Sequence, residues 1–249
     1  MTTGKTDVRS MSRFTKPLMI LAASALAVSA AAQDKPRPET EKKGNWGTMV
    51  TATEGGHLIG NPDAAGKLVE FMSYTCSHCA DFARTGDGAI KLLYVPTGKV
   101  SFEVRHLIRD PIDLTAALAA QCGEPSKFFG NHEALIIKHG EWMAKARKAT
   151  QAQTSRWRFG SFASRAQAIA SDLDFYDIME GRGFTRAQLD QCLTDEAKAN
   201  AIANQSQADI EKFDLSGTPT FIMAGKTLDA HDWKSLQPHL DEYFKSPKS

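Results

Sequence analysis

Two cysteines three positions apart, Cys76 and Cys79, are the residues of this 249-residue chain whose spacing most directly permits chemistry. They follow the apolar run 68–72 after only three residues. Thiols at this spacing fall within one helical turn, so they can form a disulfide and break it repeatedly. At the beginning of a helix, unpaired N–H groups and the helix dipole favour the thiolate of the first cysteine. The pair is therefore predicted to be a redox centre.

The two thiols are expected to have different roles. Cys76, at the helix start, is predicted to be the nucleophile, and Cys79, one turn deeper, the resolving thiol. His78 lies between them and can donate a hydrogen bond or place positive charge beside the Cys76 thiolate. The alternative is a structural zinc pair, but zinc needs further ligands and the sequence has no second C-x-x-C motif. We expect no metal and no cofactor, and we expect His132 and His139 on a helix surface.

The elements that position this pair follow from hydrophobic periodicity. Residues 48–53 alternate weakly like a strand, and 67–74 are apolar on both parities, as in a strand buried on two faces. A helix is predicted from about 76 to 93, and 100–107 alternate like another strand. The order is therefore strand, helix, strand, with the cysteine pair where the first buried strand passes into the helix.

The next hundred residues are different in kind. From Pro111 to Phe213 the chain lacks strand alternation and is rich in Ala, Leu, Lys and Gln. Strand character returns at 218–223 and 226–229, before a closing helix over 232–244. The helices predicted in the central stretch cover 112–122, 126–145, 161–172, 174–180, 186–194 and 195–212.

The first residues indicate export. Arg13 and Lys16 precede a short apolar run at 18–28, and small residues and then polar ones follow. This pattern is typical of a secretory signal peptide over 1–32, with cleavage after Ala30 or Ala32. The apolar run is short for a membrane span. We expect a periplasmic protein.

Charge and length restrict the remaining chain. The leader carries a net charge of +3, which leaves about −2 for the residues after Ala32. Such a near-neutral chain has no basic field for nucleic acid, which excludes a nucleic-acid-binding function. About 217 residues suffice for one large domain or two small ones. The four cysteines permit two disulfides in an exported protein.

Two motifs together resemble a known family. Residues 68–79, LVEFMSYTCSHC, and 217–221, GTPTF, resemble the DsbA-like thiol:disulfide oxidoreductases, and GNPDA at 60–64 is similar as well. The resemblance spans about 50–245 and implies an α/β, thioredoxin-like fold with an inserted all-helical domain. It implies a flexible lead-in at 33–47, a discontinuous thioredoxin-like domain at 48–110 and 214–249, and a helical insertion at 111–213.

The resemblance also implies roles for single residues. Pro219 would form a cis peptide bond facing the cysteine pair, and Thr218 would offer its backbone to the substrate. Glu70 would be a buried acid that helps move the proton of the resolving thiol, whereas a solvent-facing glutamate on an edge strand is the alternative. In a helical domain of this kind Cys122 and Cys192 would pair as a second disulfide, although either could be a buried core thiol.

The implied function is a monomeric periplasmic oxidase that introduces disulfides into cysteine-containing exported proteins. A membrane partner of the DsbB type would re-oxidise it. A reductase or isomerase of the same fold is the alternative, because threonine before the cis proline is similar to the isomerase branch. A non-catalytic exported binding module with a structural disulfide or zinc is a further alternative.

Overall fold

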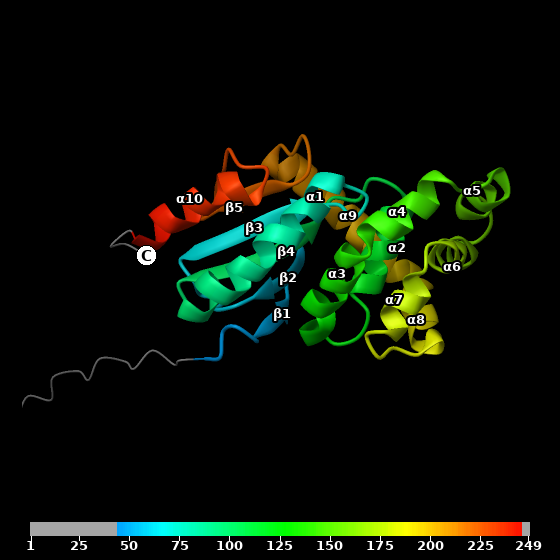
Figure 1. Cartoon of the computed structure of the whole chain (residues 1–249), viewed down its shortest axis with the longest axis horizontal. Coiled ribbons are helices and arrows are strands. Elements are labelled where there is room, and N and C mark those ends of the chain that lie inside the picture. Colours follow the sequence, from blue (N-terminus) through cyan, green and yellow to red (C-terminus); the bar gives the residue numbers. More distant parts are fainter. Residues whose placement is uncertain (1–43, 246–249) are drawn as a thin grey trace, which may run out of the picture. The chain divides into compact units, whose positions relative to one another are not determined.

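The computed structural model describes residues 44–245, which belong to one compact unit (Figure 1). The predicted signal peptide, 1–32, and most of the predicted lead-in, 33–47, lie outside the described residues. Within 44–245, no helix has both the length and the apolar character needed to cross a bilayer.

A six-stranded mixed sheet forms the framework, in the order β1-β2-β4-β3-β5-β6. β3 pairs parallel with β4, and the other pairs are antiparallel. β3 is therefore central, with a hydrogen-bonded strand on each side. The strands are β1 (Val50–Ala52), β2 (Gly56–Ile59), β3 (Gly66–Met72), β4 (Val100–His106), β5 (Thr220–Met223) and β6 (Lys226–Thr227).

The two faces of β3 contribute to different clusters of the core. Leu68 and Met72 belong to the large cluster, which extends into the helical part of the chain. Phe71, of opposite parity, packs with Leu107, Leu215 and Ile222 in a small separate cluster. Burial on both faces explains why this strand has apolar residues at both parities.

The helix that follows β3 has an unusual form. α1 (Ser77–Phe82) continues into two π-helical segments, η1 (Ala83–Asp87) and η2 (Ile90–Tyr94), and into a 3-10 turn, η3 (Val95–Thr97). The structure thus confirms a helical path over about 76–93, but with wider turns than expected. Gly86 is required inside it, because a Cβ there would lie 2.6 Å from the Phe82 ring.

Only helices connect β4 to β5, and Figure 1 shows most of them gathered at one end of the sheet. The first of them begins at Pro111 and the last ends at Phe213. They are α2 (Pro111–Ala120), η4 (Pro125–Lys127), α3 (Phe128–Ile137), α4 (His139–Arg147), α5 (Gln151–Arg158), α6 (Phe162–Asp172), α7 (Phe175–Glu180), α8 (Arg186–Leu193) and α9 (Glu196–Phe213); α10 (Trp233–Lys245) ends the described chain.

Three details differ from the sequence-based expectation. The predicted helix 126–145 is two helices, α3 and α4, which meet at Lys138. α5 was not predicted, although Thr150 and Gln153 form a capping box at its start. β2 was not predicted either, because its glycine suggested a turn. In the sheet, a Cβ on Gly56 would lie 2.0 Å from the Val104 carbonyl oxygen, so the strand needs glycine there.

Candidate active site

Cys76 lies at the junction of β3 and α1, as the sequence predicts. It is the N-cap residue of α1, with an extended backbone. Its side chain is 6% exposed, whereas Cys79 is fully buried. Both thiols are free in the structure. The first cysteine is therefore the only one of the pair with access to a substrate sulfur.

Hydrogen bonding favours the thiolate of Cys76. The Cys79 thiol makes the largest contribution, and the Thr218 side chain and the backbone N–H groups of Cys79 and His78 add to it, whereas burial opposes them. Together they lower the pKa of Cys76 to about 5. At pH 7 the thiolate then outnumbers the thiol by roughly 100 to 1. Since the thiolate is the nucleophile in disulfide exchange, Cys76 is ready to react at neutral pH.

Cys79 is in the opposite state. Burial raises the pKa of its thiol well above the usual range, and the hydrogen bond to Cys76 and the charge of Glu70 act in the same direction. Cys79 therefore holds its proton until a neighbouring group accepts it. This division fits a nucleophile and a resolving thiol.

Glu70 lies on the central strand β3 and is 1% exposed, so the edge-strand alternative for this residue is wrong. Neither carboxyl oxygen has a hydrogen-bond partner among the described residues. Burial raises the pKa of Glu70 well above its usual range, and the charges of Asp87 and Cys76 raise it further. The side chain can therefore hold a proton at neutral pH.

The loop before β5 closes over the first cysteine. The Sγ atom of Cys76 lies 3.3 Å from the Thr218 carbonyl oxygen, to which the thiol can donate. The peptide bond between Thr218 and Pro219 is cis. His78 is exposed beside the pair. A groove of about 440 Å³ adjoins them, lined by Cys76, His78, Leu107, Ile108, Arg109, Ile210, Leu215, Ser216, Gly217 and Thr218.

Two aspartates at the start of α2 fix the loop that leads to Cys76, and the sequence analysis did not identify them. The fully buried Asp113 accepts hydrogen bonds from the Ser73 hydroxyl at 2.6 Å and the Tyr74 backbone N–H at 2.7 Å. Asp110 caps α2 and accepts a bond from the Thr75 hydroxyl at 2.9 Å. The signal was an aspartate directly before Pro111, a pattern that marks a helix start.

The histidines of α3 and α4 are not on the surface, so that expectation is wrong. His132 is 1% exposed and His139 is 5% exposed. His132 lies four residues after Phe128 and four before Ile136, and both of these are buried on α3. Helical spacing therefore places it on the apolar face. It bonds to the Tyr74 hydroxyl at 2.9 Å and, through its other nitrogen, to Asp87 at 3.1 Å.

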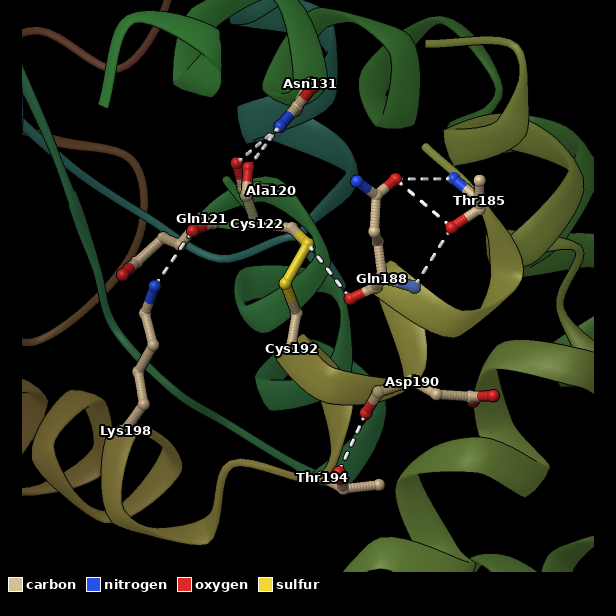
Figure 2. Close-up of a disulfide and its surroundings, with 10 residues drawn as sticks. All are labelled: Ala120, Gln121, Cys122, Asn131, Thr185, Gln188, Asp190, Cys192, Thr194 and Lys198. Atoms are coloured by element: carbon tan, nitrogen blue, oxygen red, sulfur yellow. Dashed lines mark hydrogen bonds between the residues drawn. A yellow bond between two sulfur atoms is a disulfide. The ribbon is translucent and has the colours of Figure 1, made fainter. Parts of the chain in front are cut away.

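Cys122 and Cys192 form a disulfide in the structure and are not part of the redox site (Figure 2). The bond joins the end of α2 to α8 across 70 residues of sequence. Beside it, Asn131 donates to the carbonyl oxygens of Ala120 and Cys122, which secures the end of α2. Among residues 44–245, no group of three or more metal-binding side chains occurs.

Comparisons with known proteins agree with this geometry. A family model described as thioredoxin matches residues 52–242. A crystal structure of a protein-disulfide isomerase from Novosphingobium aromaticivorans is 44% identical, with a TM-score of 0.74, and covers 77% of this chain and 98% of its own. The α-DsbA1 structure from Wolbachia pipientis has the same fold, at 21% identity, a TM-score of 0.59 and coverage of 76% and 90%.

Curated relatives carry related names. A putative protein-disulfide oxidoreductase of Rickettsia bellii is 22% identical over 90% of this chain and 76% of its own length. One from Rickettsia typhi is 29% identical over 74% of this chain, which spans 60% of that longer relative. The fold and the site define a thioredoxin-fold enzyme of thiol–disulfide exchange. The chain belongs to the thioredoxin family and is a disulfide oxidoreductase with a DsbA-like fold.

Proposed function

We propose that this chain is a periplasmic dithiol–disulfide oxidase that introduces disulfides into exported proteins through Cys76 and Cys79. The observation that carries the proposal is the contrast between the two thiols: the pKa of Cys76 is lowered to about 5, whereas that of Cys79 is raised. A stable Cys76 thiolate favours the reduced pair, so the disulfide form readily takes electrons from a substrate.

The oxidising cycle begins with the Cys76–Cys79 disulfide. A substrate thiolate attacks Sγ of Cys76, forms a mixed disulfide and releases Cys79, which takes up a proton. A second substrate thiolate then attacks the substrate sulfur of the mixed disulfide, and Cys76 leaves as a thiolate. Two electrons pass to the enzyme, and the substrate gains one disulfide.

The groove beside Cys76 is the proposed binding place for the substrate chain. Leu107, Ile210 and Leu215 supply apolar contacts there, and the backbone of Thr218 lies against the reacting sulfur. His78, exposed next to Cys76, would place a donor beside the developing thiolate. Pro219 would keep the Thr218 carbonyl in this position.

Disulfide isomerisation is the second candidate, and one observation favours it: the structure that is 44% identical to this chain is named a protein-disulfide isomerase. An isomerase acts with Cys76 reduced, as a nucleophile that attacks wrong disulfides. An oxidase must carry the Cys76–Cys79 disulfide to the substrate. The two candidates therefore need opposite redox states of the same pair.

Two refolding assays separate these activities. Oxidised protein added to a reduced substrate with several cysteines measures disulfide formation, and reduced protein added to the scrambled substrate measures isomerisation. We expect rapid oxidation and slow isomerisation, with both lost in Cys76→Ser. Faster recovery from the scrambled substrate than from the reduced one would favour the isomerase.

Export, partners and oligomeric state extend the proposal. The leader over 1–32 would direct the chain to the periplasm, where a quinone-linked membrane protein of the DsbB type would re-oxidise the pair. The enzyme would act as a monomer. Cell fractionation, with thiol trapping of the pair, tests location and re-oxidation: periplasmic, mostly oxidised protein is expected, and cytoplasmic or reduced protein would contradict it.

A further inference from the structure

A buried polar chain behind the cysteine pair has no part in the exchange steps described so far. It begins at Asp87, which is 4% exposed and lies in the π-helical segment η1. One oxygen of Asp87 bonds to Nε2 of His132 at 3.1 Å, and Nδ1 of His132 bonds to the Tyr74 hydroxyl at 2.9 Å. The other oxygen, Oδ1, has no partner among the described residues. Unpartnered buried carboxyl oxygens are costly and call for an explanation.

Two members of this hydrogen-bonded network, Asp87 and His132, line a cavity. A space of about 170 Å³ is lined by Asp87 and His132 together with Arg84, Lys91 and Glu133. Arg84 and Glu133 are exposed, so the mouth of the cavity lies at the surface. Polar walls of this kind suit water that exchanges protons with Asp87 and His132.

Glu70 is a second buried carboxyl group, and it acts on the redox pair. Glu70 lies on the same face of β3 as the core residues Leu68 and Met72, and neither of its oxygens has a partner. Asp87 acts electrostatically on Glu70, and Glu70 acts on Cys79. Asp87 is therefore close enough for its charge to oppose the ionisation of Glu70.

The π-helical turn explains how one helix presents both groups. Cys79 and Asp87 are eight residues apart, which in a regular α-helix is two turns and nearly one residue more. The wider turn over η1 accommodates the additional residue and brings Asp87 back to the face of Cys79. Both residues are buried, and the helical stretch packs in the same core cluster as Leu68 and Met72 of β3.

We propose that Asp87 and His132 are positioning residues that carry protons between this cavity and Glu70, and thereby set the protonation of Glu70 whenever Cys79 gains or loses its proton. The inference rests on the proposed thiol–disulfide exchange at Cys76 and Cys79. When the disulfide is reduced, Cys79 leaves as a thiolate and takes a proton from the Glu70 carboxyl. Glu70 recovers a proton from Asp87 and His132, and water in the cavity supplies theirs. In the reverse direction the same proton returns to solvent.

The charges around Asp87 determine the direction in which a substitution of Asp87 changes the ionisation of Glu70. His132 and Glu133 face it from α3, Arg84 and Lys91 from its own helical stretch, and Glu70 from β3. The negative charge of Asp87 opposes ionisation of Glu70. Asp87→Asn removes that charge and retains a side chain that can bond to His132. Glu70 then loses its proton at lower pH.

The test is stopped-flow reduction of the oxidised protein by dithiothreitol between pH 5 and 9. The reduction rate of each variant is expressed as a ratio to the wild-type rate at the same pH. Asp87→Asn is expected to slow the reaction by up to about 100-fold at alkaline pH. The rate of Asp87→Asn should begin to fall at a lower pH than the rate of wild type, so that the ratio decreases as the pH rises. In a Glu70→Gln background, Asp87→Asn is expected to have no further effect, because the route ends at Glu70.

Two further variants keep the test decisive. Asp209→Asn is the matched control, because Asp209 is also a buried carboxylate, 1% exposed and paired with Arg105; its ratio should not change with pH. If Asp87→Asn does not fold, His132→Gln replaces it and should slow the alkaline reaction in the same way, because the hydrogen-bonded route from the cavity through His132 to Asp87 is interrupted. The proposal would be overturned if the ratio of the Asp87→Asn rate to the wild-type rate did not change with pH. It would also be overturned if Asp87→Asn still slowed the reaction in the Glu70→Gln background. An inactive wild-type protein would instead refute the exchange reaction itself.

Discussion

At Cys76, burial and hydrogen bonding act on the thiol in opposite directions, and hydrogen bonding dominates. Burial alone would raise the pKa of this thiol, as it does for Cys79 three residues later. The Cys79 thiol, the Thr218 side chain and the backbone N–H groups of Cys79 and His78 reverse the effect, and the pKa of Cys76 is about 5. Two thiols in one helical turn thus acquire separate roles from position alone.

Alkylation of the reduced protein at varied pH should reveal this separation. Cys76 is expected to react with a half-maximal rate near pH 5, and Cys79 to remain unmodified up to about pH 9 because its pKa is raised. Mass spectrometry identifies the modified cysteine. In Cys79→Ala the Cys76 midpoint should rise, because the largest stabilising bond is lost. A wild-type midpoint near 8.5, the value of a free thiol, would contradict the account.

The same lowered pKa predicts how the stability of the reduced protein depends on pH. A thiol with a pKa lower in the folded state contributes stability above its unfolded pKa and loses it as pH falls to the folded value. For Cys76 this interval runs from about pH 9 down to about pH 5. Urea unfolding should show the reduced protein losing stability relative to the oxidised one across this interval. A pH-independent difference between the two forms would be the contrary result.

Asp113 has a structural part in the same site, because its carboxylate holds the loop that leads to Cys76. The Oδ2 atom accepts bonds from the Ser73 hydroxyl and the Arg109 backbone N–H, and Oδ1 accepts from Tyr74. Asp113→Asn replaces one acceptor with a donor, so we expect a loss of about 1–3 kcal/mol in stability. Urea unfolding measures this loss, with Asp241→Asn on α10 as a partly exposed control. Equal stability of Asp113→Asn and wild type would show that the bonds contribute nothing.

The sequence was informative about residues whose role depends on local spacing. The cysteine pair and its place between strand and helix were predicted, because three-residue spacing and an apolar run are local signals. The burial of His132 was predictable too, from Phe128 and Ile136 four residues away on either side. The approach of Asp87 to Glu70 was not, because it depends on how a helix packs on the sheet and on a wide turn that no residue pattern marks.

Among the elements, long periodic segments were predictable and short ones were not. β3, β4 and the long α9 were expected near their observed bounds. β2 has four residues, and its first is a glycine required by contact with the neighbouring strand. The contact with the neighbouring strand, which the sequence does not show, explains the glycine. From the sequence alone, the glycine suggested a turn.

The Cys122–Cys192 disulfide acts at the scale of elements, because it joins α2 to α8. It closes a loop of 70 residues, so replacing both cysteines with alanine should cost about 4 kcal/mol on the chain-entropy account. Denaturant unfolding of the double variant measures this cost. The rate of Cys76 alkylation should be unchanged, because the disulfide lies outside the redox site. A change in that rate would show that the two sulfur centres are coupled.

At the scale of the whole molecule, the sheet and the helical part of the chain together position Cys76. β3 delivers the chain to the cysteine pair, and Asp110 and Asp113 of α2 hold the connecting loop. The Thr218 carbonyl, from the loop before β5, lies against the sulfur. Segments more than 140 residues apart in sequence thus meet at one atom.

The reduction potential of the Cys76–Cys79 pair tests the central claim most directly. Glutathione titration of the purified protein, followed by thiol trapping and mass spectrometry, reports the pair separately from Cys122 and Cys192. The account predicts a potential above roughly −180 mV, as expected for an enzyme whose reduced form is stabilised by a thiolate. A potential near −270 mV, the value typical of thioredoxin, would contradict the oxidase and identify a reductant.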